Sequence, residues 1–556
     1  MNIKEDLQKI IVGTAKNMGM EVREVLVETP KEKSHGDYST NVALALSKKL
    51  GKSPLQLAQS IAGGITKPDF LEKVEAVAPG FINFYLSEEI FIENIRQILK
   101  EKDRYGSNPP SLKLRRAKKV IVEYTDPNIL KEFHIGHLMS NAIGESIARI
   151  FEFQGATLKR VNYQGDVGLH VAKAIWGKLK NPDMAWAKAY AFGAAKYEED
   201  EAAKKEIIDI NKKVFEKSDK EINALYHQGR KESLAYFDAI YKKLGTDFDR
   251  LFFESEVADT GKKIVMDNVG KVFEKGDQGA IVFKGENVGL HTRVFINSEG
   301  LPTYEAKDLA LPELKYRYFK YDSSIIITAH EQNAYFDVML AALAKVKPNL
   351  AEKTKHIGHG MLRLPEGKMS SRTGKVVTAE SLIEKIKEQV TKKSADKKLD
   401  DATIQTIAIG ALKYSILKQS IGSDIIFDFD KSISFEGDSG PYLQYSYVRA
   451  VSVLKKGKRE KVKASLKKMP AEITQLEKMM RRFPEVVEKS AQEYEPHIIT
   501  LYLTELAREF NNYYAHHKIV EKTDGFSPYK VALTEAFSVI MKNGLWLLGI
   551  QAPQKM

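Results

Sequence analysis

The chain has 556 residues, 43% of them hydrophobic and 29% charged, a balance that is ordinary for a soluble globular protein and argues against disorder. It carries 86 Lys and Arg against 74 Asp and Glu, which gives a formal charge of +12. This charge is typical of a protein with a polyanionic partner such as RNA, but it is explained equally well by solubility alone. With no cysteine, disulfides, thiolate zinc sites and cysteine nucleophiles are excluded.

The N-terminal region is predicted to be a small α+β domain. An amphipathic helix begins at Ile3, a helix rich in Ala and Leu begins at Asn41, and strands are predicted at 75–77 and 81–86. The turn Asn108-Pro109-Pro110 marks a boundary, so this domain is expected to cover 1–107. The charged start and the lack of a long apolar run predict a cytoplasmic protein with no membrane partner.

A parallel α/β sheet is predicted next. A strand at 120–122, a turn at 125–128, a helix at 138–153 and a strand at 158–163 form a βαβ pattern typical of a Rossmann-like fold. A helical insertion is expected at about 178–285, and strand patterns at 280–283 and 324–328 suggest that the sheet resumes there. This second domain is expected to cover 108–425.

The rest of the chain, 426–556, is predicted to be an all-α domain. Amphipathic helical stretches are expected at 402–419, 442–456, 470–490, 495–517 and 530–548. No repeat or low-complexity tract is present. The fold class is therefore α/β, with a Rossmann-like domain between a small α+β domain and a helical domain.

The motif His134-Ile135-Gly136-His137 follows a predicted strand and opens a predicted helix, where free N–H groups and the helix dipole attract phosphate. Two imidazoles on one face of the first turn can donate hydrogen bonds to phosphate oxygens, and Gly136 lets a nucleotide approach the backbone. Incidental histidines or a metal site are the alternatives. The same four letters recur at His356-Ile357-Gly358-His359, ahead of a strand-like stretch, and we expect that copy to be structural.

A second motif is Lys368-Met369-Ser370-Ser371-Arg372, which lies between glycines and is expected to form a mobile loop. Cations on such a loop can close over a triphosphate and stabilise the charge that develops during attack on the α-phosphorus. An ordinary basic surface loop would be the better reading if this motif stood alone. Together, the two motifs predict catalysis on a nucleotide.

These motifs resemble the HIGH and KMSKS signatures of class I aminoacyl-tRNA synthetases. The surrounding residues narrow the resemblance to the arginyl-tRNA synthetase family; they lie at 35–41, 79–84, 122–124, 127–128, 302–304, 308, 434–437, 440–445 and 547–553. The resemblance implies that the chain activates arginine with ATP and Mg²⁺ and transfers it to tRNA, often only when tRNA is present. The N-terminal domain would contact tRNA, and the helical domain would bind the anticodon.

The resemblance also implies roles for individual residues. Arginine would be bound by Glu123, Asn128, Tyr304, Asp308 and Gln332. ATP would be bound by His134, Gly136, His137, Lys368, Met369 and Ser370, and the catalytic charges would come from His134, His137, Lys131, Lys368 and Arg372. Asn83, Tyr442, Gln444, Tyr445 and Tyr513 would contact tRNA, although core packing is an alternative for Tyr513. A carboxylate such as Asp308 can accept two hydrogen bonds from a guanidinium, which selects against lysine.

The chain departs from the family pattern at two places. Ser371 stands where the family usually has the second lysine of the mobile loop. In this family a lysine just before the first motif can replace that loop lysine, and Lys131 occupies this position. After Gly165-Asp166, His170 stands where many relatives have glutamine, so its role is open.

Two rival functions remain. The chain could be a synthetase for another amino acid, such as glutamine or glutamate, or an inactive tRNA-binding protein. We expect the protein to be a monomer.

Overall fold

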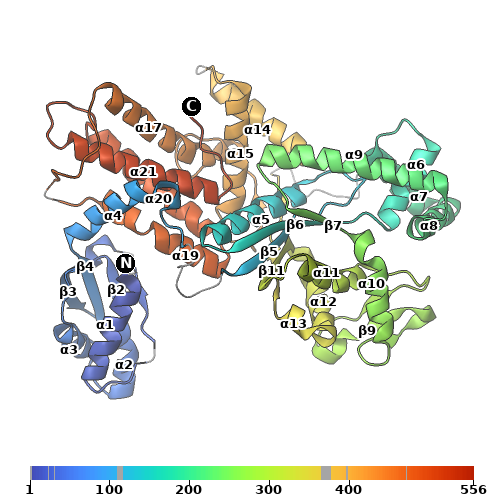
Figure 1. The fold of residues 1–556 in the computed structure, drawn as a ribbon, viewed down its shortest axis with the longest axis horizontal. Coiled ribbons are helices and arrows are strands. Elements are labelled where there is room, and N and C mark those ends of the chain that lie inside the picture. Colours follow the sequence, from blue (N-terminus) through green and yellow to red (C-terminus); the bar gives the residue numbers. More distant parts are fainter. Residues whose placement is uncertain are drawn as a thin grey trace. The chain divides into compact units, whose positions relative to one another are not determined.

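The computed structural model describes residues 3–556 except 23, 31, 109–116, 365–376, 396–397 and 471. The chain divides into two compact units. One contains Met1–Lys102, Val453–Arg482 and Asn512–Val539, and the other contains Asp103–Ser452, Phe483–Asn511 and Ile540–Met556. Figure 1 labels the helices and strands of both units. Among the residues that the structure describes, no helix combines the length and the apolar character needed to span a bilayer.

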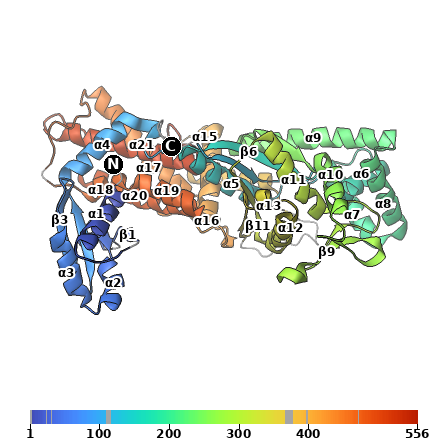
Figure 2. The ribbon, with the colours of Figure 1, turned by 60° about the horizontal axis from the view of Figure 1, so that its bottom comes forward.

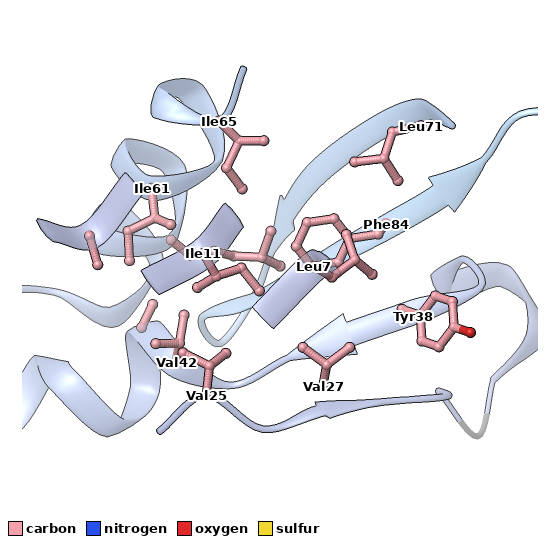
Figure 3. Packing of buried hydrophobic residues seen from close by; sticks show 14 of the residues in the cluster. Leu7, Ile11, Val25, Val27, Tyr38, Val42, Ile61, Ile65, Leu71 and Phe84 are labelled. Atoms are coloured by element: carbon pink, nitrogen blue, oxygen red, sulfur yellow. The ribbon is translucent and has the colours of Figure 1, made fainter. Parts of the chain in front are cut away.

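The first unit is built on a four-stranded antiparallel sheet in the order β1-β2-β4-β3. Its strands are β1 (Val27–Glu28), β2 (Tyr38–Thr40), β3 (Leu71–Val77) and β4 (Phe81–Leu86), and its helices include α1 (Ile3–Asn17), α2 (Val42–Leu50), α3 (Pro54–Gly64), α4 (Glu88–Glu101) and α18 (Gln475–Arg481). Leu7 and Ile11 lie one helical turn apart on α1 and pack with Ile61 and Phe84 (Figure 3). The predicted small α+β domain is confirmed in its fold.

The second unit is built on a five-stranded parallel sheet in the order β12-β11-β5-β6-β7. The strands are β5 (Lys119–Tyr124), β6 (Thr157–Gln164), β7 (Arg250–Phe253), β11 (Ser323–Ala329) and β12 (Thr354–His359). The strand order reverses between β5 and β11, and ligands of open α/β sheets bind outside the carboxyl ends of the strands at such a switch point. The predicted Rossmann-like fold is therefore confirmed.

Helices cover both faces of this sheet. On one face, Tyr124 packs against Gly144 of α5 (Ile135–Phe153), where a Cβ atom would lie 2.3 Å from the tyrosine ring. On the other face, Ile121 packs with Leu311 of α11 (Tyr304–Tyr318). Side chains of a strand alternate between faces, so Glu123 must point toward α11.

The other helices of this unit are α6 (Leu169–Lys180), α7 (Trp186–Glu199), α8 (Glu201–Glu216), α9 (Lys220–Leu244), α10 (Glu254–Asp267), α12 (Asn333–Val346), α13 (Pro348–Ala351), α14 (Ala379–Lys393), α15 (Asp401–Leu417), α16 (Phe429–Ser432) and α19 (Phe483–Glu493). In the described part of the chain, three α-helices have residues in both units: α17 (Gly440–Arg459), α20 (His497–His516) and α21 (Ser527–Leu547). Figures 1 and 2 show α6, α7 and α8 grouped together, with the long α9 running from them toward the sheet.

Four details differ from the sequence prediction. The strand expected at 280–283 is β9 (Ile281–Phe283), but it belongs to a separate antiparallel sheet with β8 (Glu274–Lys275) and β10 (Arg293–Ile296), so the central sheet does not resume there. The central sheet instead takes β7 from within the expected helical insertion. The stretch 470–490 contains two helices, α18 and α19, rather than one. A short parallel pair, β13 (Leu362–Arg363) and β14 (Ile425–Ile426), was not predicted.

A buried lysine joins two helix ends to α15. The Nζ atom of Lys413 donates hydrogen bonds to the carbonyl of Leu244 at 2.6 Å and to that of Gly549 at 2.8 Å. Leu244 ends α9 and Gly549 follows α21, and carbonyls at helix C-termini favour a cation. Burial lowers the pKa of Lys413 to about 7. The lysine therefore satisfies two carbonyls that would otherwise lie unpaired in the interior.

Replacing Lys413 by methionine is expected to destabilise this unit by about 2 kcal/mol, since each unpaired buried carbonyl costs about 1–3 kcal/mol and loss of the desolvated ammonium offsets part of it. Thermal unfolding followed by circular dichroism checks this. Lys418→Met, which changes a lysine at the end of the same helix, is the control and should leave the transition unchanged. Equal transitions for the two variants would contradict the capping role of Lys413.

Candidate functional site

The first histidine motif caps helix α5. The Nδ1 atom of His134 accepts hydrogen bonds from the backbone N–H groups of Gly136 at 3.1 Å and His137 at 3.4 Å. The Nδ1 atom of His137 accepts one from the N–H of His134 at 3.2 Å, and the two rings stack with centroids 3.6 Å apart. A Cβ atom on Gly136 would lie 3.0 Å from the His134 ring, so glycine leaves room for this arrangement.

Burial keeps both rings neutral, and the hydrogen bonds fix their tautomer. Burial, followed by the charge of Lys131, lowers the pKa of His134 to about 4. Burial, then the His134 ring, lowers the pKa of His137 well below its usual value. Both imidazoles are therefore neutral near pH 7, and because Nδ1 accepts, the ring proton sits on Nε2. The pair offers two Nε2–H donors, which suit an anionic ligand oxygen.

A second part of the site lies on α11. Tyr304, Asp308 and Lys315 are spaced four and seven residues apart, so they share one face of that helix. Lys315 is fully buried, and its Nζ atom lies 3.1 Å from the carboxylate of Glu123 on β5. A second buried ion pair joins Lys307 of α11 to Glu254 at the start of α10. Both lysines therefore have carboxylate partners already.

Two further acids have no ion-pair partner among the described residues. Asp308 accepts a hydrogen bond from the Tyr335 hydroxyl at 2.6 Å and forms no ion pair with any described residue. Removal from water raises the pKa of Asp308 to about 7, and the charges of Glu254 and Glu123 add to the rise. Asp126 accepts from the backbone N–H of Tyr163 at 2.7 Å, and burial, then Glu123, raises its pKa well above the usual value.

The cluster of ionisable side chains between β5, β6 and α11, called the acidic pocket below, therefore has more acids than bases. It contains the carboxylates of Glu123, Asp126, Glu254 and Asp308 against the ammonium groups of Lys307 and Lys315. Glu123 and Glu254 are balanced by the two lysines, whereas the raised pKa values of Asp126 and Asp308 favour their protonated forms; an incoming cation would stabilise the ionised forms of these two unpaired acids. This charge balance suits a cationic ligand such as a guanidinium.

The other expected arginine ligands are Asn128, Tyr304 and Gln332. A Cβ atom on Gly165 would lie 2.0 Å from the Asn128 Oδ1 atom, so only glycine allows that side chain its position. The Tyr304 ring is 49% exposed, and Lys307 Nζ lies 4.3 Å from its centroid. Gln332 is exposed on the short 3₁₀ helix η5 (His330–Gln332), which follows β11 at the switch point.

Some residues near the pocket had no signal in the sequence. Glu254 and Tyr335 reach it from helices α10 and α12, far along the chain. Lys315 could have been found from its spacing on α11. The Tyr163 hydroxyl has no partner among the described residues, and its pKa is raised by burial and then by the charge of Asp308.

The residue that departs from the family, His170, is buried. Its Nε2 atom lies 3.1 Å from the Gly165 carbonyl, and burial lowers its pKa to about 3, so the neutral ring donates from Nε2. Among the described residues its Nδ1 atom has no partner. His170 therefore holds the Gly165 loop that borders Asn128.

The second copy of the motif has a different setting. It forms the edge strand β12, where the His356 ring stacks on Phe336 with centroids 4.0 Å apart and its Nε2 lies 2.8 Å from the Thr328 hydroxyl. His359 is buried, with Nδ1 2.6 Å from the Gly360 carbonyl. Neither histidine opens a helix, as the sequence predicted.

The expected loop residues Lys368, Met369, Ser370 and Arg372 lie outside the described part of the chain. Of the expected tRNA contacts, Asn83, Gln444 and Tyr513 are buried. Asn83 accepts from Ser39 at 2.7 Å within the N-terminal sheet, and Gln444 donates to the Gln551 carbonyl at 2.9 Å. These three side chains are buried in the described structure, and their contact with tRNA stays a prediction. Tyr442 and Tyr445 are half-buried.

Comparison with protein families gives matches along most of the chain. Residues 94–429 match the catalytic domain of class I tRNA synthetases for arginine. Residues 443–556 match the DALR anticodon binding domain, and residues 1–86 match the arginyl tRNA synthetase N-terminal domain.

Relatives extend over the full length. The arginine–tRNA ligase of Clostridium perfringens is 31% identical, with 99% of this chain and 100% of the relative covered. That of Halothermothrix orenii is also 31% identical, with 100% of both covered. The solved arginyl-tRNA synthetase of Thermus thermophilus superposes with a TM-score of 0.74 at 25% identity over 100% of each chain. The Plasmodium falciparum enzyme shares the fold, with a TM-score of 0.80 at 22% identity, covering 100% of this chain and 99% of its own. The chain belongs to the arginyl-tRNA synthetase family of class I aminoacyl-tRNA synthetases.

Proposed function

We propose that the switch point between β5 and β11 is where this ATP-dependent arginine–tRNA ligase activates arginine. The carboxylate of arginine attacks the α-phosphorus of ATP and pyrophosphate leaves; the 3′-terminal ribose hydroxyl of tRNA then attacks the carbonyl carbon of arginyl-adenylate, forming the ester and releasing AMP. The observation that carries the proposal is one of charge: two Nε2–H donors open α5, and an acidic pocket lies on the α11 face beside the same strand, β5.

The histidines would act on the phosphate. His134 and His137 would donate to oxygens around the α-phosphorus, where negative charge grows in the transition state, and neutral preorganised donors need no rearrangement. Lys131 would stabilise the departing pyrophosphate, together with Lys368 and Arg372 of the loop. Mg²⁺ would arrive with ATP, bound through the phosphate oxygens. No side chain acts as a nucleophile.

The acidic pocket would select arginine. Asp308 would accept two hydrogen bonds from the planar guanidinium, an arrangement that the single ammonium of lysine cannot reproduce. Tyr304 would offer its hydroxyl as an acceptor, and Asn128 or Gln332 would hold the α-amino group. Glu123 would act mainly through its charge, because Lys315 already holds its carboxylate.

The remaining assignments concern the whole molecule. We propose domain limits of 1–107, 108–425 and 426–556, with tRNA(Arg) meeting the first and last domains. Tyr442 and Tyr445, which are half-buried, are better placed for that contact than the buried Asn83, Gln444 and Tyr513. The protein would work as a monomer in the cytoplasm.

The direct test is aminoacylation of bulk tRNA with each of the twenty amino acids in turn. Charging with arginine and with no other amino acid supports the proposal. A preference for glutamine or glutamate would overturn the arginine assignment, and failure to charge with any amino acid would show an inactive tRNA-binding protein.

Replacing Lys131 by methionine should lower the rate of ATP–pyrophosphate exchange by about 10²-fold, because the transition state loses one cation on the pyrophosphate side. The methionine keeps the length of the stem, so folding should be preserved. Exchange is measured with tRNA(Arg) present, with Lys173→Met as a control lysine on α6. Unchanged exchange would remove Lys131 from the mechanism.

A further inference from the structure

The ammonium group of Lys131 is held by an aromatic ring of the helical insertion. Its Nζ atom lies 4.6 Å from the centroid of the Tyr190 ring on α7. Lys131 forms no ion pair with any residue that the structure describes, and its charge lowers the pKa of both His134 and His137 after burial does. The ammonium, three residues before His134 in the chain, therefore acts electrostatically on the motif histidines and has the Tyr190 ring as its partner.

The loop that carries Lys131 is fixed by helix α9. The backbone N–H of Leu130 donates to the Ser233 hydroxyl at 2.9 Å, and Leu130 has a φ of +65°, which an L residue adopts only when its surroundings impose it. A Cβ atom on Gly229 would lie 2.5 Å from the Leu130 side chain, so the glycine provides the space. Phe133 N–H donates to the Tyr236 hydroxyl at 3.4 Å. The loop backbone thus has contacts on both sides of Lys131.

Helix α7 is fixed in turn. A Cβ atom on Gly177 of α6 would lie 2.3 Å from the Ala189 carbonyl, and one on Gly193 of α7 would lie 2.1 Å from the Lys173 carbonyl, so the two helices touch backbone to backbone. Trp186 donates from Nε1 to Glu232 of α9 at 2.8 Å. Tyr190 lies between Trp186 and Gly193, so these contacts fix the backbone from which its ring projects.

We propose that Tyr190 is a positioning residue for Lys131: its ring face holds the ammonium beside the motif histidines, so that the insertion helices α7 and α9 take part in arranging the ATP site. The inference rests on the proposed role of Lys131 in stabilising pyrophosphate. A cation over an aromatic face is attracted by about 0.5–2 kcal/mol. Both phenylalanine and tyrosine offer such a face, whereas leucine does not.

The test compares Tyr190→Phe with Tyr190→Leu in ATP–pyrophosphate exchange with tRNA(Arg) present. The phenylalanine variant should keep at least about half of the exchange rate, and the leucine variant should lose about 5- to 20-fold in kcat with the KM for arginine unchanged. Tyr197→Leu is the matched control. Tyr197 lies on the same helix and holds Lys173 at 4.0 Å in the same kind of contact, so its replacement should leave exchange unchanged.

A double-mutant cycle assigns the effect to Lys131. In the Lys131→Met background, Tyr190→Leu should cost less than about twofold, because the cation that the ring positions is gone. Equal exchange by the phenylalanine and leucine variants, or an equal loss in both backgrounds, would overturn the inference. Full exchange by Lys131→Met alone would instead refute the proposed role of Lys131, and the two failures are thereby distinguished.

Discussion

Replacing both His134 and His137 by asparagine should lower the rate of arginyl-adenylate formation by at least about 10³-fold while the protein stays folded. Each lost donor to developing charge costs about 2.7–4 kcal/mol. Asparagine places an acceptor near the position of Nδ1, so the helix cap of α5 is kept, but it has no equivalent of the Nε2–H group. Single-turnover formation of labelled adenylate measures the effect.

Two controls separate the donor from the cap. Glutamine at His134 places an amide near Nε2 and removes the capping acceptor, so it should retain more activity than asparagine while losing about 1 kcal/mol of stability. His356→Asn changes the second copy of the motif and should leave the rate unchanged. If the double asparagine variant forms adenylate at the normal rate, the first motif is not the phosphate site.

Replacing Asp308 by asparagine should raise the KM for arginine by about 10²-fold or more, because a charge pair held away from water contributes about 2–5 kcal/mol when one partner is removed. The KM for ATP should change little. Asp322→Asn is the control, since Asp322 caps the N–H of Lys119 at the opposite end of the same sheet. An unchanged KM for arginine in Asp308→Asn would remove this carboxylate from the pocket.

Arginine affinity should also depend on pH through Asp308. Its pKa is about 7 in the protein without arginine, so the carboxyl group becomes protonated as the pH falls below 7 and can no longer pair with a guanidinium. Binding of the cation favours the ionised form, so the KM for arginine should rise by up to about tenfold per pH unit below 7 and level off above it.

The groups around Asp308 shape this profile. Tyr335 donates to it, Lys307 lowers its pKa, and Glu254 and Glu123 raise it. Asp126, whose pKa is also raised, can make the slope steeper. In Asp308→Asn the dependence should flatten, and a slope identical to that of the parent protein would assign the titration to another group.

The fold was predictable where a local pattern decided it. A continuous βαβ pattern is visible in the sequence: an apolar strand at 120–122, a turn, a long helix and a second strand at 158–163. The structure has β5, α5 and β6 at these places. The assignment of β9 to the central sheet failed because a short apolar strand carries no information about its partner strands. For the same reason the sequence did not identify β7 as a strand of the central sheet, and its residues were included in the expected helical insertion.

The site was predictable only in part. The tautomer of His134 and His137 follows from backbone hydrogen bonds that a sequence does not show. Glu254 and Tyr335 come to Asp308 by tertiary contacts over long separations in the chain. Asn83 reads as an exposed polar residue in the sequence, whereas the sheet of the first unit buries it.

The measurement that tests the central claim most directly is a crystal structure with a sulfamoyl analogue of arginyl-adenylate. The account predicts the sulfamoyl oxygens within hydrogen-bond distance of the Nε2 atoms of His134 and His137, and the guanidinium paired with Asp308. An analogue bound beside His356 and His359, or one with its guanidinium away from the α11 face, would contradict it.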